Sequence, residues 1–110
     1  MRYLVLIADL KEQRSAEEQA AVYEKLGPWF ADLAASGKLV GGEQLEPSVT
    51  ARTVRVAGEK VLVTDGPFVE TKEVVGGFVV LECSSIDEAV GIAKTWPGPE
   101  GVLEVRPLAE

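Results

Sequence analysis

Two segments of the chain are apolar at almost every position, residues 3–8 near the start and residues 78–81 in the second half. Successive side chains of a strand point to opposite faces of a sheet, so a strand with one solvated face alternates apolar and polar residues. A continuous apolar run is typical of a strand covered on both faces. The pattern therefore predicts two central strands, the first over residues 2–8.

Helical spacing appears in two further segments. Ser15 followed by Glu18 is a capping box, in which the serine side chain and the glutamate side chain satisfy each other's backbone N–H groups. The helix that follows carries one apolar face, made of Val22, Leu26, Trp29, Phe30 and Leu33. Because Pro28 lacks an N–H and its ring clashes with the carbonyl four residues back, we expect a kink or short break there. Ser85 and Glu88 form a second capping box, which opens a second helix.

The remaining strands come from shorter apolar runs. Residues 38–45 predict a strand weakened by Gly41-Gly42, for which a β-bulge is the plainest explanation. Residues 53–56 and 60–64 predict a β-hairpin, and residues 102–106 predict the last strand. The order is β-α-β, a hairpin, then β-α-β, which is the ferredoxin-like split arrangement. We therefore expect one α+β domain over residues 1–110, with an antiparallel sheet and an inserted hairpin.

The doubly apolar strands also bear on oligomeric state. Right-handed crossovers place both helices on the same face of such a sheet, which leaves its second apolar face open. An exposed apolar face of that size exceeds what monomers usually tolerate, and pairing with a second copy removes it. The sequence thus predicts a homodimer. The alternative is a monomer in which the hairpin and the loops fold over the open face.

Composition restricts the partners. The chain has 110 residues, 46% of them apolar and 26% charged, which is ordinary for a globular domain. Eleven basic residues against 18 acidic ones give a net charge of −7, which repels a nucleic-acid backbone. The apolar run at the N-terminus is shorter than a secretory signal, nothing approaches a membrane span, and Cys83 has no partner for a disulfide. We expect a cytoplasmic protein that binds neither nucleic acid nor membrane.

The sequence contains no histidine, which excludes a Ser-His-Asp triad, a Cys-His pair and imidazole metal ligands. Proton transfer would have to use carboxylates, lysine, tyrosine, cysteine or water. No spacing pattern predicts an all-carboxylate metal site, so we expect neither a metal nor a cofactor. We interpret Cys83 as a buried structural thiol, and Trp29 and Trp96 as core or interface aromatics.

The polar segment over residues 65–77 is long for a connection in a small domain and is the place where we expect function. It opens with Asp65-Gly66-Pro67, in which the glycine accepts a positive φ and the proline fixes the next φ. Such a rigid turn would hold the Asp65 carboxylate in one orientation beside the sheet. Gly66, Pro67 and Phe68 are the predicted ligand-binding residues of this segment.

Further along the same segment, Glu70 and Glu73 lie three residues apart with Lys72 beside them, so one helical turn would bring them together. Two carboxylates near an ammonium group supply an acid and a base with separated pKa values. We predict that Asp65 is a base or an orienting group. Glu70 and Glu73 would carry protons, and Lys72 would stabilise a developing anion. The alternative interpretation is a turn followed by a solvated run of charges.

Asp9 is the remaining predicted ligand-binding residue. It ends the first strand, where its carboxylate would point into a pocket. The alternative interpretation is an isolated turn residue, which is the commoner role for a single carboxylate in this position.

Residues 65–68 read Asp-Gly-Pro-Phe, followed by Glu-Thr-Lys-Glu at 70–73 and Gly-Gly-Phe at 76–78. In this motif the chain resembles the DGPF branch of the YCII-related family. The agreement extends over essentially the whole chain, from residues 2–4 to residues 104–108. The resemblance implies a dimeric α-β barrel, in line with the two-faced sheet.

The resemblance implies more than one possible activity. Some relatives resemble small-ring isomerases or dehydrochlorinases that act without a metal or an organic cofactor. The His-Asp pair of related branches has no counterpart here, because the chain lacks histidine. The DGPF branch is also associated with alternative sigma factors. Two hypotheses follow: a cofactor-free enzyme acting on a small organic acid or lactone, or a non-catalytic module that binds a ligand or a sigma factor.

Overall fold

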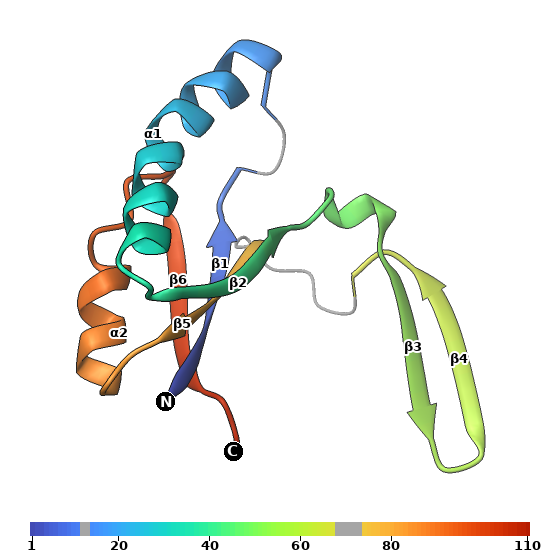
Figure 1. Ribbon diagram of the computed structural model, residues 1–110. Coiled ribbons are helices and arrows are strands. Elements are labelled where there is room, and N and C mark those ends of the chain that lie inside the picture. The colour runs from blue at the N-terminus through green and yellow to red at the C-terminus, as the bar shows by residue number, and fades with distance from the viewer. Residues whose placement is uncertain (12–13, 68–73) are drawn as a thin grey trace.

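The computed structural model describes residues 1–11, 14–67 and 74–110, and Figure 1 shows their arrangement. The strands and helices follow one another as β1 (Arg2–Asp9), α1 (Ala16–Ala35), β2 (Leu39–Gln44), the short 3₁₀ helix η1 (Ser48–Thr50), β3 (Arg52–Ala57), β4 (Lys60–Asp65), β5 (Val74–Glu82), α2 (Ile86–Ala93) and β6 (Gly101–Pro107). This order confirms the predicted one. β5 begins four residues earlier than the apolar run at 78–81 indicated, because its first residues include two glycines that carry no hydrophobic pattern.

Four strands form one antiparallel sheet in the order β2-β5-β1-β6, which confirms the ferredoxin-like fold. Both helices lie on the same side of it (Figure 1). On that face Tyr3 of β1 pairs with Leu81 of β5, and Val5 pairs with Val79. All four side chains are at most 3% exposed and form the core with Leu33 of α1 and Ala89 of α2.

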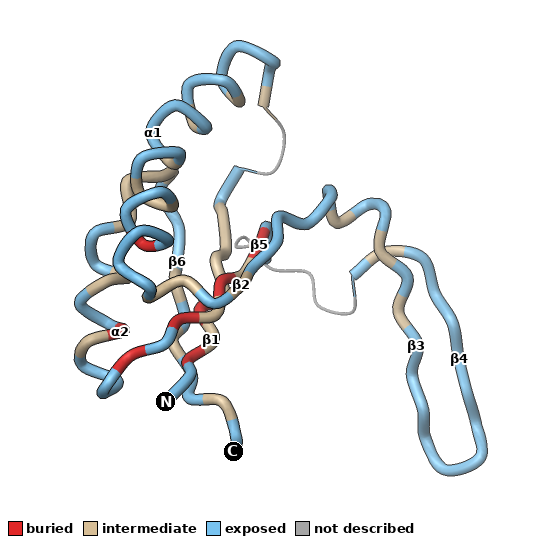
Figure 2. The backbone as a smooth tube through the Cα atoms, in the orientation of Figure 1, coloured by how far each residue is buried: buried red, intermediate tan, exposed pale blue. Residues whose placement is uncertain are grey.

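The opposite face of the sheet carries the alternate residues of the same two strands. Leu4 pairs with Val80, and Leu6 pairs with Phe78, so these four apolar side chains form a continuous patch. Each of them is partly exposed (Figure 2). We call this the open face. Its existence matches the prediction that the central strands are apolar on both sides.

Helix α1 begins with the predicted capping box. The Glu18 N–H donates to Ser15 Oγ at 3.1 Å, and the Ser15 N–H donates to Glu18 Oε1 at 3.0 Å. The helix then runs unbroken through Pro28, so the expected break is wrong. Proline removes a single backbone hydrogen bond, and Trp29, Phe30 and Leu33 hold the following turns against the core. The ribbon of α1 curves along its length (Figure 1).

Strands β3 and β4 form the predicted hairpin as a separate two-stranded sheet. We call residues 52–65 the arm. It projects away from the four-stranded sheet and does not lie over the open face, so the hairpin does not cover that face as the monomer alternative expects (Figures 1 and 2). The homodimer itself stays a prediction. At the base of the arm the Gly66 N–H donates to the Ala51 carbonyl at 2.8 Å, and Thr53 Oγ1 donates to the Gly66 carbonyl at 2.6 Å.

Candidate functional site

A cavity of about 680 Å³ lies between α1 and the helix-covered face of the sheet. Pockets for small organic ligands typically span about 300–1,000 Å³, so its size suits such a ligand. Its apolar lining comes from both layers: Ile7, Val22, Leu26, Phe30, Leu39 and Val79. The cavity exists because the two halves of α1 pack differently against the sheet. Leu33 near the C-terminal end of the helix is buried in the core, whereas Val22 and Leu26 in the middle stay partly exposed and face the cavity.

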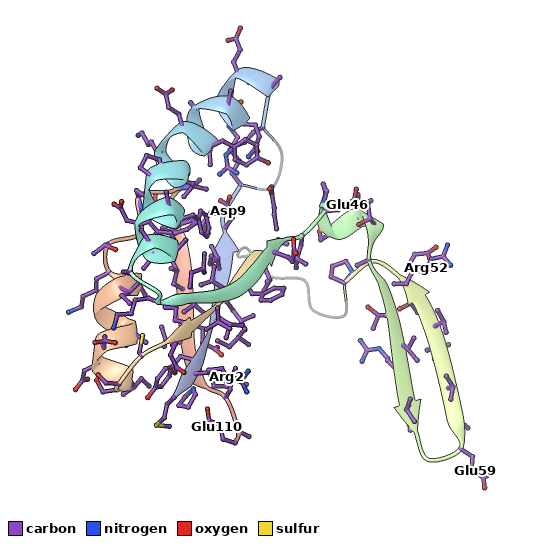
Figure 3. All side chains as sticks on the ribbon, in the orientation of Figure 1. Arg2, Asp9, Glu46, Arg52, Glu59 and Glu110 are labelled. Carbon is purple, nitrogen blue, oxygen red and sulfur yellow. The ribbon has the colours of Figure 1, made fainter. Side chains whose placement is uncertain are left out.

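The charged end of the cavity is built by the connection from β1 to α1. Arg14 Nη1 lies 2.7 Å from Asp9 Oδ2, and Arg14 Nη2 donates to Asp9 Oδ1 at 3.0 Å, so the ion pair is bidentate. The Lys11 N–H also donates to Asp9 Oδ1, at 2.9 Å. The two side chains are only 12% and 22% exposed, for Arg14 and Asp9 respectively. Figure 3 shows Asp9 at the end of β1, on the side of the sheet that carries α1.

This pair fixes the protonation state of Asp9. Partial burial alone would raise the pKa of the Asp9 carboxyl, because it penalises the charged form. The hydrogen bonds from Arg14 and from the Lys11 N–H act in the opposite direction and outweigh burial, so the pKa lies below its ordinary value. Asp9 is therefore a carboxylate at neutral pH.

The same connection is tied to the start of α1. Lys11 Nζ lies 2.5 Å from Glu18 Oε2, while the other oxygen of Glu18 accepts from the Ser15 backbone in the capping box. The hydrogen bond from Lys11, with that from Ser15, lowers the pKa of Glu18 to about 2. One side chain thus joins the helix start to the loop that presents Asp9 and Arg14. The orientation of the ion pair is in this way linked to the helix cap.

The opposite rim of the cavity has a polar contact between layers. Tyr23 of α1 donates its hydroxyl hydrogen to Gln44 Oε1 of β2 at 2.8 Å. Nearby, the register between β2 and β5 shifts between Leu39 and Gly41, which confirms the predicted bulge. Gly42 has a φ of 153°, and a Cβ placed there would lie 2.5 Å from the Phe78 carbonyl oxygen. Close approach of two strands explains the glycine at this position.

Trp96 forms part of the cavity wall, and Trp29 supports it from behind. The Trp96 ring packs edge-on against Trp29 with the centroids 5.2 Å apart. The Trp29 indole N–H donates to Thr95 Oγ1 at 2.8 Å, and the Trp96 indole N–H donates to the Pro99 carbonyl at 3.2 Å. Trp29 packs against the core, as expected. Trp96 also forms part of the cavity wall, which places an intrinsic fluorophore in contact with it.

The predicted site residues are dispersed. Asp9 lines the cavity. Asp65 ends β4 with its side chain 92% exposed, 3.7 Å from Arg52 Nε across the arm, and Gly66 and Pro67 follow it at the base of the arm. These three residues contribute nothing to the cavity wall. Phe68, Glu70, Lys72 and Glu73 lie outside the described residues, so the convergence predicted for them stays a prediction.

Sequence reasoning missed Arg14, Tyr23 and Gln44 as cavity residues. Arg14 carried one usable signal, since it stands directly before the N-cap Ser15 and only five residues after Asp9. Tyr23 is adjacent to Val22 on the rim of the apolar helix stripe. Neither signal specifies a cavity, because the space depends on how far α1 stands from the sheet.

Other chemistry is limited in the described part of the chain. Cys83 is buried, as predicted, and burial raises the pKa of its thiol. Within residues 1–11, 14–67 and 74–110 no three His, Cys, Asp or Glu side chains gather as metal ligands would. No helix in these ranges is long and apolar enough to cross a membrane.

Comparison with known proteins identifies a family and several similar proteins. The family model of the YCII-related domain matches residues 1–110. An uncharacterised protein of Rhizobium meliloti is 36% identical over 99% of this chain and 93% of its own length. A structure of 5-chloro-2-hydroxyhydroquinone dehydrochlorinase from Burkholderia phenoliruptrix, in complex with 2,5-dihydroxybenzoquinone, aligns with a TM-score of 0.53 at 18% identity. That alignment covers 99% of this chain and 94% of the other, and it shows a shared fold.

Proposed function

The chain belongs to the YCII-related family, and we propose that it binds a small oxygen-bearing ring compound, such as a hydroxylated ring or a lactone, and transfers a proton on it without a cofactor. The binding site is the cavity between α1 and the sheet. The observation that carries this proposal is the Asp9–Arg14 pair at the charged end of a largely apolar cavity. An apolar pocket with few convergent polar groups is the usual form of a small-ligand site.

The pair supplies complementary groups to such a ligand. A guanidinium has five N–H donors, of which the contacts with Asp9 use one on Nη1 and one on Nη2. The donors that remain on Arg14 are available to a ligand oxygen, and they stabilise negative charge that develops there. The apolar wall made by Val22, Leu26 and Phe30 accommodates the ring itself.

Asp9 is the proton acceptor in this scheme. It takes a proton from a ring hydroxyl, or from a carbon next to a ring carbonyl, and becomes a neutral carboxylic acid. Arg14 meanwhile stabilises the oxyanion left on the ligand. The depressed pKa keeps Asp9 ionised before the ligand arrives, and transfer of the Arg14 hydrogen bonds to the ligand raises its basicity. In an isomerisation the proton returns from Asp9 to a different ligand atom. In an elimination a leaving group on the ligand departs with its bonding electron pair, and Asp9 gives the proton to that group or to water.

The structural relative supplies the first probe. That protein is a dehydrochlorinase whose structure contains 2,5-dihydroxybenzoquinone, a small ring with oxygen substituents. The same compound, together with aromatic hydroxy acids and unsaturated lactones, forms a suitable panel for this chain. Binding is followed by calorimetry and by quenching of Trp96, which lines the cavity.

The decisive variant is Asp9→Asn, which preserves size and removes the charge. We expect ligand affinity to fall at least about tenfold, because Arg14 loses its partner and reorients. Turnover of any accepted substrate should be lost. Asp32→Asn is the matched control, since Asp32 is an exposed carboxylate on α1 outside the cavity, and it should leave both quantities unchanged. Unchanged binding and turnover in Asp9→Asn would overturn the proposal, and so would the absence of binding by every panel member.

The roles predicted for Asp65, Glu70, Lys72 and Glu73 remain proposals. They rest on the sequence motif and its spacing, whereas the role of Asp9 rests on its contacts in the cavity. Asp65→Asn tests the first of them with the same panel. If Asp65→Asn lost turnover and Asp9→Asn kept it, the reaction would take place at the segment after the arm and not at the Asp9–Arg14 pair.

We also propose that the protein is a homodimer joined through the open face. The supporting observation is the uncovered patch of Leu4, Leu6, Phe78 and Val80. A cytoplasmic location and a sigma-factor partner stay predictions. The first rests on the lone cysteine, and the second rests on the family resemblance alone.

A further inference from the structure

A second, smaller hollow adjoins the cavity, and the reaction proposed above does not use it. It has a volume of about 300 Å³ and lies between α1 and the connection from α2 to β6. We call it the side hollow. Arg14, Val22 and Pro99 line both the cavity and the side hollow, so the two spaces share a wall. A ligand bound in the cavity next to Arg14 is therefore within reach of the side hollow.

One wall of the side hollow is a stripe along α1. Its residues recur three or four positions apart, or stand next to one that does, and so share one side of the helix: Glu18, Ala21, Val22 and Lys25. The small Ala21 side chain in the middle of the stripe leaves room for a ligand group. Charged side chains stand on either side of this space.

The opposite wall is the turn Pro97-Gly98-Pro99, which is held in one shape. Two prolines restrict its backbone. The Trp96 ring packs on Gly98 so closely that a Cβ placed there would lie 2.5 Å from the ring. The hydrogen bond from the Trp96 indole to the Pro99 carbonyl ties the end of the turn to the same ring. This wall exists before a ligand arrives, so binding against it costs little ordering entropy.

Arg14 keeps a second pair of parallel donors free. Its Nη1 and Nη2 groups each give one hydrogen to Asp9. In a planar guanidinium the Nε–H and the other hydrogen of Nη2 lie parallel on the adjacent edge, and this edge fits the two oxygens of a carboxylate. Nε has no hydrogen-bond partner among the described residues, and none of their buried side-chain nitrogens lacks one, so Nε is accessible. The edge can therefore meet a ligand while the pair with Asp9 stays intact.

Charge at this end of the cavity also favours an anion. The charged residues that line the charged end and the side hollow are three cations and two carboxylates, a net charge of +1: Lys11, Arg14, Lys25, Asp9 and Glu18. Asp9 is paired with Arg14, and Glu18 with Lys11. No carboxylate of the described chain pairs with Lys25. In a chain with a net charge of −7, this local excess of positive charge attracts an anionic group.

We propose that the ligand carries a carboxylate on a short side chain, and that this carboxylate binds in the side hollow between the free edge of Arg14 and Lys25. This rests on the function proposed above and narrows its substrate class to ring compounds with an acidic side chain. The ring stays in the cavity, where its oxygen meets Asp9 and the remaining hydrogen of Arg14 Nη1. Arg14 thus binds both ends of one ligand, and the carboxylate fixes the ring oxygen beside Asp9.

The first test compares three phenols that differ only in the group next to the hydroxyl. They are 2-hydroxyphenylacetate, its neutral amide 2-hydroxyphenylacetamide, and 2-methylphenol, which lacks the polar group. Calorimetry on the full chain should show at least about tenfold tighter binding of the acid than of the amide, because only the carboxylate accepts charge-assisted hydrogen bonds from both donors of the edge.

Equal affinity for the acid and the amide would overturn the side hollow and leave the proposed function standing. Failure of all three phenols to bind would also overturn it, whereas the proposed function falls only if its own panel fails to bind as well.

Lys25→Gln tests the second cation. Affinity for 2-hydroxyphenylacetate should fall about three- to fivefold, since the ammonium group is exposed, and affinity for the amide should stay unchanged. Lys94→Gln is the matched control, because Lys94 is an exposed lysine at the end of α2 that lines neither space. Unchanged binding of the acid by Lys25→Gln, or an equal loss in Lys94→Gln, would contradict the proposal.

Ala21→Leu fills the side hollow without touching a charge, and leucine is a good helix former. Affinity for the acid should fall at least about fivefold, because the added side chain occupies the place of the carboxylate. Binding of 2-methylphenol should persist, which also shows that the variant folds with its cavity intact. Ala20→Leu, at an exposed neighbouring position outside both spaces, should bind all three phenols as the wild type does. Full affinity of Ala21→Leu for the acid would place the carboxylate elsewhere and refute the site.

Discussion

Two antiparallel strand pairs of this protein have similar composition and very different surroundings. In the pair of β1 and β5, Val5 and Leu81 are 1% and 0% exposed. In the pair of β3 and β4, Val56 and Leu62 are 71% and 57% exposed. Both pairs are antiparallel and rich in β-branched residues, so strand propensity does not distinguish them, although the register of β1 and β5 shifts between Ile7 and Ala8. The difference is that α1 and α2 cover one face of the first pair, whereas no described part of the chain forms a layer over the second pair (Figure 2).

This difference separates two groups of residues: those that stabilise a single chain, and those that would stabilise the protein only in contact with a second surface. Core residues of β1 and β5 contribute to the free energy of unfolding of a single chain. Residues of the arm contribute to it only when another surface removes them from water. The comparison therefore predicts a different response to the same substitution in each pair.

The largest effect is expected from Leu81→Ala compared with Leu62→Ala. Truncation of Leu81, which is fully buried between β1 and the helices, should lower the free energy of unfolding by about 2–5 kcal/mol. Leu62 lies on the side of the arm opposite Val56 and Val61, and the same truncation there should cost less than about 0.5 kcal/mol. Urea unfolding at low protein concentration measures both. Similar losses for the two variants would mean that the arm is part of the monomer's core.

A second pair of substitutions compares backbone constraint in the two regions. Gly42→Ala introduces a Cβ 2.5 Å from the Phe78 carbonyl oxygen at a φ of 153°, and it should cost about 2–3 kcal/mol. Gly58, at the tip of the arm, has a φ of 62° and open space around it. Alanine at Gly58 should cost about 1 kcal/mol, confined to the hairpin. Gly41→Ala is the control, since nothing lies within 4 Å of its added Cβ. If Gly42→Ala left the free energy of unfolding unchanged, β2 and β5 would be able to move apart at little cost.

Local signals in the sequence predicted the elements well. The capping box at Ser15 and Glu18, the continuous apolar run of residues 3–8 and the hairpin of the arm each depend on neighbours in the chain. The break expected at Pro28 is wrong because the rule for proline is local, while the packing of Trp29 and Leu33 that retains the helix is not. Local rules thus identify an element more securely than they predict its continuity.

The site depended on tertiary structure and was less accessible from sequence. The motif around Asp65 is polar and rich in turn residues, which predicts a site there, whereas the Asp65 side chain itself lies exposed on the arm. The cavity instead arises where α1 stands away from the sheet, and no spacing pattern encodes that separation. Asp9 was identified as a strand-end carboxylate, but its partner Arg14 emerged only from the path of the intervening loop.

The smallest expected effect concerns acid stability and compares an ion pair of the body with one of the arm. In the folded chain the hydrogen bond from Lys11 holds the pKa of Glu18 at about 2, below its ordinary value of 4.5. Because the folded pKa is depressed, the contribution of Glu18 is present above about pH 4.5 and is lost as the pH falls towards 2. Glu18→Gln should therefore flatten the decline in stability between pH 4.5 and 2, measured by urea unfolding at each pH. Glu17→Gln, in the same helical turn, and Asp65→Asn, whose pair with Arg52 is almost fully exposed, should leave that slope unchanged. An equal flattening in Asp65→Asn would show that the arm is held against the protein surface in acid, contrary to its exposure.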